Sequence, residues 1–136
     1  MVGGFLIFKT INIKDLFYRF LILIVLFIWR IYMNYRLFID DERFPISPDW
    51  FVARTSGQAI DAVRMYGLPQ EIAFDHDLGG EDTSVVFLNH LECYILDNEL
   101  KFPKDFIYTV HSQNPVGAAN IASKMDSFIK YFGYEE

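Results

Sequence analysis

Apolar runs of strand length alternate with segments of helical periodicity along residues 34–136. Four of the runs are short and rich in β-branched and aromatic residues, and they lie at positions 35–39, 51–55, 72–74 and 106–110. Apolar residues at helical spacing follow the last three runs, within segments 56–66, 83–97 and 115–132. Strands that alternate with helices are joined by crossovers, which make the sheet largely parallel and place helices on its faces. The pattern therefore predicts an α/β domain with a mainly parallel sheet of about four strands.

Capping residues mark the ends of the predicted helices. Ser56 is suited to the N-cap of the first helix, because its hydroxyl can accept a hydrogen bond from a free N–H of the first turn. Asn114 followed by Pro115 predicts the start of the last helix, since the missing N–H of proline is not needed at the first helical position. Residues 41–50 are too few and too proline-rich for a crossover helix. We therefore expect a minimal loop or a short helical turn between the first two strands.

The predicted helix 83–97 has one apolar face and carries the only cysteine of the chain. Its inward side chains are expected to be those of Phe87, Leu88, Leu91 and Ile95. Cys93 is expected to be buried as a small apolar side chain. A single cysteine excludes an internal disulfide and fits a reducing compartment, so we expect a cytoplasmic protein.

Residues 1–33 form a hydrophobic N-terminal segment ahead of the predicted domain, residues 34–136. The segment contains an unbroken apolar run, residues 20–29, with arginine on both sides. A membrane-spanning helix needs about 20 apolar residues, so the length is borderline. Three explanations stay open: a mis-assigned start with Met33 as the true first residue, an inner-membrane anchor, and a packed element of the domain.

The charge of the chain is unevenly distributed. Its 136 residues have a formal net charge of −6, but residues 1–33 hold four basic residues against one acidic residue. The net +3 of this segment leaves −9 on residues 34–136. Such an acidic surface repels the phosphate backbone, so we expect no binding to nucleic-acid duplexes. A phosphate-bearing substrate would need a local positive group or a metal ion.

Acidic residues follow two of the predicted strands at the points where these strands end. Asp40 and Asp41 come directly after the first strand, and Asp75 follows the central one. Because the carboxyl ends of parallel strands share one edge, where ligands bind, these carboxylates should converge. Carboxylate oxygens are ligands that Mg²⁺ and Mn²⁺ prefer. We therefore expect Asp40, Asp41 and Asp75 to hold such an ion, although single aspartates can also serve only as loop or helix caps.

Two of the three histidines lie at the same strand ends. His76 follows Asp75, and His111 follows the last predicted strand. Two imidazoles at one crevice could divide the proton transfers of phosphodiester cleavage between attacking water and leaving oxygen. We expect His76 and His111, together with Asp75, to be catalytic, and scaffolding hydrogen bonds are the alternative. His90, within a helix, is expected to be a surface or half-buried residue.

The start of the last predicted helix is a candidate anion site. The free N–H groups and positive dipole end that follow Asn114 would face the crevice beside His111. Ser112 and Asn114 could add hydrogen bonds to a phosphate oxygen. Arg43 and Arg54 are the nearest candidate phosphate clamps. We expect Ser112, Asn114 and Arg43 to bind substrate, with simple capping and surface charge as the alternatives.

The residues at the strand ends resemble the receiver domain of bacterial signalling, which has a flavodoxin-like fold. Asp40 and Asp41 match its metal-binding acidic pair. Asp75 matches its phosphoacceptor, and Ser112 lies roughly at its Ser/Thr position. A receiver needs no histidines at these ends, and it carries a lysine after a fifth strand that has no clear counterpart here. The resemblance implies a three-layer, receiver-like sandwich.

Three longer motifs resemble the divergent group called cyclic-phosphate-processing receiver-like domains. They read IDDERFP at residues 39–45, FDHDLG at residues 74–79 and HSQNPVGAANI at residues 111–121. Members of this group occur in bacteria and their phages and are inferred to act on cyclic phosphates such as the ADP-ribose cyclic phosphate left by RNA repair. The resemblance covers about residues 34–132 and implies a nucleotide-like cyclic phosphate as substrate.

The leading hypothesis is therefore a metal-assisted phosphoesterase that opens a cyclic phosphate by water attack. The alternative is a non-enzymatic, receiver-like signalling or partner-binding module, in which Asp75 is phosphorylated or inactive. A transition-metal site formed by His76, Asp75 and His111 is a third hypothesis, but no His-x-x-x-His spacing favours it.

Overall fold

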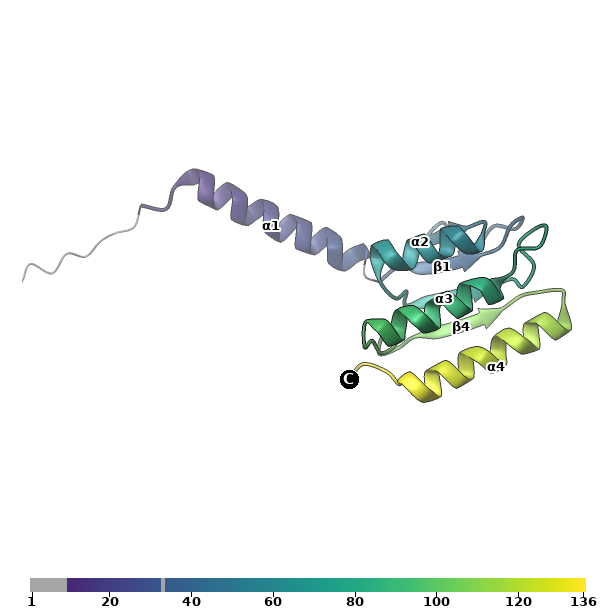
Figure 1. The fold of residues 1–136 in the computed structure, drawn as a ribbon. Helices are drawn as coiled ribbons and strands as arrows, with labels where there is room; N and C mark the ends of the chain where they lie inside the picture. The colour runs from purple at the N-terminus through teal and green to yellow at the C-terminus, as the bar shows by residue number, and fades with distance from the viewer. Residues whose placement is uncertain (1–9, 33) are drawn as a thin grey trace, which may run out of the picture. The chain divides into compact units, whose positions relative to one another are not determined.

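A computed structural model describes residues 10–32 and 34–136 of the chain. The chain divides into two compact units, Met1–Ile31 and Tyr32–Glu136. In the second unit, strands and helices alternate as the apolar pattern predicts (Figure 1). Met33, which the start-site explanation invokes, lies outside the described residues.

Helix α1, Ile13–Tyr32, begins in the first unit and consists mainly of large apolar residues. Its apolar side chains are exposed, among them those of Phe17, Phe27 and Trp29. Charged side chains interrupt the helix near its start, at Lys14, Asp15 and Arg19. Within the described ranges, no helix combines the length and apolarity that crossing a membrane requires. The start-site and anchor explanations of this segment stay predictions.

The second unit is built on a four-stranded sheet in which neighbouring strands are all parallel. The order across the sheet is β2-β1-β3-β4, where the strands span Arg36–Ile39 (β1), Trp50–Ala53 (β2), Glu71–Phe74 (β3) and Ile107–Val110 (β4). Ile39 pairs with Ala53 on one side and Phe74 on the other, and Phe74 pairs with Val110. All four strands therefore end level with one another, which confirms the predicted α/β fold and brings the residues after β1, β3 and β4 to one edge.

Three helices cover one face of the sheet: α2 (Ser56–Tyr66), α3 (Ser84–Asp97) and α4 (Pro115–Phe132) (Figure 1). The main core lies between this layer and the strands. Its strand residues all point to the same face, and the largest among them are Leu37, Ile39, Ile72 and Phe74. The inward residues of α3 are buried as the helical spacing predicts, namely Phe87, Leu88, Leu91 and Ile95.

The opposite face of the sheet carries a different set of side chains. Arg36 pairs with Glu71 at 2.7 Å and also lies over the ring of Trp50, 4.1 Å from its centroid. The Trp50 ring in turn meets Phe38 edge-on. No helix of the described residues 34–136 contributes core side chains on this face. The described part of the sandwich therefore consists of the sheet and one helical layer, whereas parallel sheets are usually covered on both faces.

Two local predictions were wrong. The N-cap of α2 is Thr55, whose hydroxyl accepts a hydrogen bond from the backbone N–H of Gln58, and Ser56 is the first helical residue. Thr55 has the extended backbone that a cap requires. Both neighbouring positions carry a hydroxyl residue, so the sequence did not show which of the two is the cap. Cys93 is exposed, because it lies off the apolar stripe of α3. The connection between β1 and β2 contains no helix, as expected.

Candidate functional site

Asp40 follows β1 and is completely buried. Its Oδ1 accepts the backbone N–H groups of Glu42 and Arg43 at 2.9 and 2.6 Å. Its Oδ2 lies 2.9 Å from Nε2 of His111 and 3.1 Å from Nε of Arg43. Burial alone would raise the pKa of Asp40, but the two backbone hydrogen bonds, the His111 hydrogen bond and the Arg43 charge outweigh it and hold the pKa below its ordinary value. Asp40 is therefore a buried, ionised carboxylate that fixes the loop after β1.

Asp75, at the end of β3, is joined to Asp40 through Arg43. Its Oδ1 accepts the N–H of His76 at 2.8 Å, and its Oδ2 lies 3.1 Å from Nη2 of Arg43. The hydroxyl of Ser84, at the start of α3, donates to the backbone carbonyl of Asp75. Arg43 is thus a positive partner of the kind that clustered carboxylates need.

Asp41 completes a group of three carboxylates. One oxygen from each of Asp40, Asp41 and Asp75 can be chosen so that all lie within 4.8 Å of one another. Gly79 has a positive φ of 87°, and a Cβ added there would lie 3.4 Å from Oδ2 of Asp41. The glycine therefore allows the turn after β3 to pass close to this carboxylate.

A pocket opens beside the three carboxylates. The residues that line it come from the loops after β1, β3 and β4 and are Asp41, Glu42, Arg43, Asp75, Asp77, Gly79, Gly80, Ser112 and Gln113. Four of the predicted site residues, Asp41, Asp75, Arg43 and Ser112, share this pocket. Neither His76 nor His111 is among its lining residues.

His111 is held from two sides. Its ring stacks on Phe38 with 4.9 Å between centroids and 10° between planes, and its Nε2 contacts Asp40. Since Phe38 belongs to the face without helices, the imidazole lies on that side of the sheet edge. About a quarter of the side chain is exposed (26%).

His76 lies on the other side of the sheet edge. Its Nδ1 is 3.0 Å from Oδ1 of Asp77, and its ring packs against Gly117 in α4. Gly117 belongs to the helical layer, so the two imidazoles lie on opposite faces at the end of the sheet. The contacts of the described residues include none that joins His76 to His111.

Asn114 and Ser112 mainly stabilise the start of α4. The Oδ1 of Asn114 accepts the N–H of Gly117 at 2.9 Å, which confirms the predicted cap. Its Nδ2 lies 3.4 Å from Oδ2 of Asp77. The hydroxyl of Ser112 accepts the N–H of Asn114 at 3.1 Å. Only Ser112 of these two also lines the pocket.

Arg54 does not act on the pocket directly. Its Nη1 donates to the backbone carbonyls of Asp40 and Arg43 at 2.8 and 2.5 Å, and its guanidinium lies over the ring of Phe44. It therefore braces the loop that presents Arg43.

Two positions that shape the site escaped prediction, Phe38 and Gly117. Phe38 and Asp40 are two residues apart, which places them on the same side of an extended strand, and this spacing could have indicated the aromatic support of the site. Gly117 stands early in a strongly predicted helix, where glycine is unfavourable, and this could have indicated a close approach to another group.

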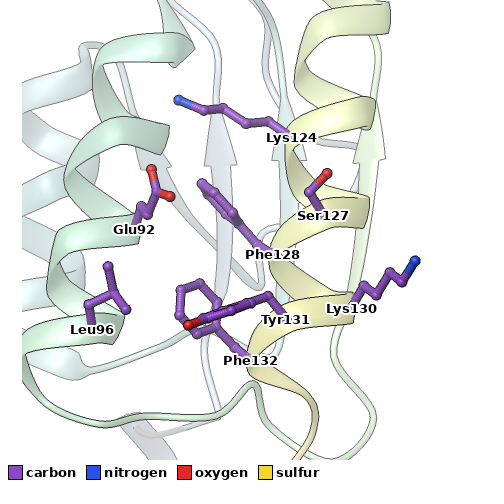
Figure 2. A pocket seen from close by; sticks show the side chains of 8 residues that line it. All are labelled: Glu92, Leu96, Lys124, Ser127, Phe128, Lys130, Tyr131 and Phe132. Atoms are coloured by element: carbon purple, nitrogen blue, oxygen red, sulfur yellow. The ribbon is translucent and has the colours of Figure 1, made fainter.

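A second hollow lies between α3 and α4, among residues to which no chemistry was assigned (Figure 2). Phe128, Tyr131 and Phe132 extend from α4 toward α3, while Lys130 points away from that helix. None of the residues that line the first pocket lines this hollow.

Comparison with known protein families decides the assignment. The model of the cyclic-phosphate processing receiver domain matches residues 35–127. The chain belongs to this family. The match spans the sheet, all the strand-end motifs and most of α4, and it confirms the suggested resemblance. No curated protein and no solved structure matched the chain. In this cyclic-phosphate processing receiver domain, the edge of the sheet carries acidic residues at the positions where a receiver has them, and two histidines lie beside these residues.

Proposed function

We propose that this receiver domain is a metal-assisted phosphoesterase that opens a cyclic phosphate by attack of water. The observation that carries the proposal is the convergence of three carboxylates, Arg43 and His111 at one edge of the sheet. These groups could supply the counter-charge and the proton transfer that opening an anionic ring requires. The family description, which names cyclic-phosphate processing, supports the same class of substrate.

A divalent cation would fit Asp40, Asp41 and Asp75. The receiver resemblance implies such an ion, and the close spacing of three carboxylate oxygens suits Mg²⁺ or Mn²⁺. When bound, the ion would neutralise charge on the phosphoryl oxygens. The fit has one condition: Arg43 must leave the Oδ2 atoms of Asp40 and Asp75, which it contacts in this structure.

The proposed reaction forms one bond and breaks another. The water oxygen bonds to phosphorus, and the bond from phosphorus to one ring oxygen breaks, which leaves a phosphomonoester and a free hydroxyl group. A base takes one proton from the water, and an acid gives one proton to the leaving oxygen. We assign one of these transfers to His111, because its ring is partly exposed and is oriented by Asp40 and Phe38.

His76 is the candidate for the second transfer. In an in-line displacement, the entering and leaving oxygens lie on opposite sides of phosphorus. The placement of His76 and His111 on opposite faces of the sheet edge is compatible with that division. His76 would need to turn from Asp77 toward the pocket.

Arg43 and Ser112 are the proposed contacts for the phosphate, because both line the pocket beside the carboxylates. Asn114 would act with them mainly by fixing the first turn of α4. The substrate would be small and nucleotide-like.

Hydrolysis assays with a matched histidine control test the proposal. ADP-ribose cyclic phosphate and cyclic nucleotides are incubated with the protein in Mg²⁺ or Mn²⁺, and ³¹P NMR follows the loss of the ring. We expect His111→Ala to lower kcat/KM by roughly 100-fold or more, the usual contribution of a general acid or base. His90→Ala, in α3, should retain full activity. A His111→Ala protein as fast as the wild type would contradict the mechanism.

A non-enzymatic receiver module is the second candidate, favoured by the position of Asp75 beside the acidic pair, where a receiver carries its phosphoacceptor. Incubation with acetyl phosphate and Mg²⁺, followed by intact mass measurement, distinguishes the two. A phosphoryl adduct on wild type that Asp75→Asn lacks, together with inactivity on the whole cyclic-phosphate panel, would favour the module.

A further inference from the structure

The charge balance of Asp40 and Asp75 depends on one partly exposed side chain, that of Arg43. Its guanidinium contacts both carboxylates at 3.1 Å, through Nε to Asp40 and through Nη2 to Asp75. The third nitrogen, Nη1, donates to the backbone carbonyl of His111 at 3.1 Å. All three guanidinium nitrogens are therefore engaged at the site, although 45% of the side-chain surface is exposed.

Arg43 stands beside the one acceptor position of Asp40 that no hydrogen bond fills. A carboxylate offers about four lone-pair positions, and here two backbone N–H groups bind Oδ1 and His111 binds Oδ2, while Arg43 pairs with Oδ2 by charge at 3.1 Å. The N–H groups are fixed by the loop backbone, and the His111 ring is held by its stacking on Phe38. The Arg43 side chain is therefore the partner of Asp40 that can leave.

After Arg43 turns away from Asp40, the pocket could hold both the divalent cation and the displaced guanidinium. Among the residues that the structure describes, Asp41 has no hydrogen-bond or ion-pair partner, and it lines the pocket together with Arg43. A guanidinium that turns away from Asp40 and Asp75 would still lie in this pocket, beside Ser112. Because both carboxylates are buried, departure of Arg43 alone would leave uncompensated buried charge, and the entering cation has to replace the positive charge that the guanidinium removes.

We propose that Arg43 is a displaceable counter-cation, which neutralises Asp40 and Asp75 in the free protein and turns to a phosphate or sulfate oxygen when a divalent cation takes its place. This inference rests on the cation site of the proposed function. The exchange couples the two ligands, because the cation frees the guanidinium that the anion needs. Linkage requires that each ligand then tighten binding of the other by the same factor.

Binding of Mn²⁺ to the full chain, followed by the EPR signal of the free ion, tests the exchange. Sulfate serves as the anion probe, because it is a tetrahedral dianion that leaves Mn²⁺ in solution. In the wild type, we expect sulfate to tighten Mn²⁺ binding by roughly tenfold. In Arg43→Gln, we expect Mn²⁺ without sulfate to bind roughly tenfold tighter than in wild type, and sulfate to have no further effect.

Arg36→Gln is the matched control. Arg36 also pairs with a carboxylate, Glu71, and its side chain is similarly exposed (38%), but it lies at the opposite end of β1 from the site. This variant should bind Mn²⁺ and respond to sulfate as the wild type does. Arg43→Lys keeps the charge but lacks the planar fork that bridges two carboxylates, so its Mn²⁺ affinity should lie between those of wild type and Arg43→Gln.

The outcomes separate this inference from the proposed function. Equal or weaker Mn²⁺ binding by folded Arg43→Gln and Arg43→Lys overturns the exchange, while a wild type that binds Mn²⁺ and opens cyclic phosphates leaves the proposed function standing. Asp41→Asn should weaken Mn²⁺ binding, because it removes a proposed ligand. Absence of Mn²⁺ binding in both wild type and Arg43→Gln overturns the exchange and the metal part of the function together.

Discussion

Gly117 and His76 are packed so closely that the absence of a side chain on Gly117 determines where the His76 ring can lie. A Cβ added to Gly117 would lie 2.3 Å from Cγ of His76 and 2.4 Å from its Cδ2. Only a residue without a side chain lets the imidazole rest against the first turn of α4. The position of a proposed catalytic group thus depends on a residue 41 positions later in the sequence.

Gly117→Ala should displace His76 and destabilise the domain. We expect a loss of about 1–3 kcal/mol in the free energy of unfolding, the usual cost of overpacking, measured by urea denaturation. The shifts of the His76 ring in NMR spectra should change as well.

Gly57→Ala is the matched control for this prediction. Gly57 also lies in the first turn of a helix, but its added Cβ would meet only Oγ1 of Thr55, at 3.7 Å. Alanine is the better helix former, so this variant should gain up to about 1 kcal/mol. Equal effects of the two substitutions would show that the contact with His76 is unimportant.

Among the secondary-structure elements, the starts of the three helices shape the edge of the sheet at which the strands end. The N-caps Thr55, Thr83 and Asn114 each follow a strand end or its loop and turn the chain back along the sheet. Asn114 and Thr55 satisfy a free N–H of the first turn with their side chains, whereas Thr83 does not. From residue type alone, the two threonines would be expected to cap their helices equally well.

Thr55→Ala and Thr83→Ala should therefore differ in cost. Both threonines have nearly the same extended backbone, but only the Thr55 hydroxyl accepts a hydrogen bond, from Gln58 at 3.1 Å. We expect Thr55→Ala to lose about 1 kcal/mol of unfolding free energy and Thr83→Ala clearly less. Urea denaturation of both variants measures the difference, and a larger loss for Thr83→Ala would contradict the assigned caps.

The core of the second unit is one-sided at the scale of the whole domain. All helices of the described residues 34–136 pack on one face, and none of these helices covers the opposite face. Ile72 is completely buried on the helical face, whereas Ile107 is 56% exposed on the other face. Two isoleucines on adjacent strands therefore experience different environments.

Ile72→Ala and Ile107→Ala test this asymmetry. We expect Ile72→Ala to lose about 2–5 kcal/mol of unfolding free energy, because it leaves a cavity in the core. Ile107→Ala should lose less than about 1 kcal/mol, since the side chain is half in solvent already. Thermal or urea unfolding compares the two, and similar losses would mean that the second face is packed as tightly as the first.

Local patterns in the sequence determined the elements and the edge of the sheet on which chemistry would be found. Short apolar runs and helical spacing predicted all four strands and the three helices of the second unit, because strands of a parallel sheet are rich in apolar residues and helices bury one apolar face. The parallel topology then placed Asp40, Asp41 and Asp75 together, since strand ends in such a sheet are neighbours whatever the details of packing.

Only the tertiary structure decided how the side chains at that edge are paired. That Arg43 bridges Asp40 and Asp75, and that His76 and His111 lie on opposite faces, depends on loop conformations and on contacts with Phe38 and Gly117. Such contacts join residues far apart in the chain and have no period that a sequence could reveal. The sequence by itself therefore determined which groups gather at the edge, and the packing of the loops and α4 decided which of them touch.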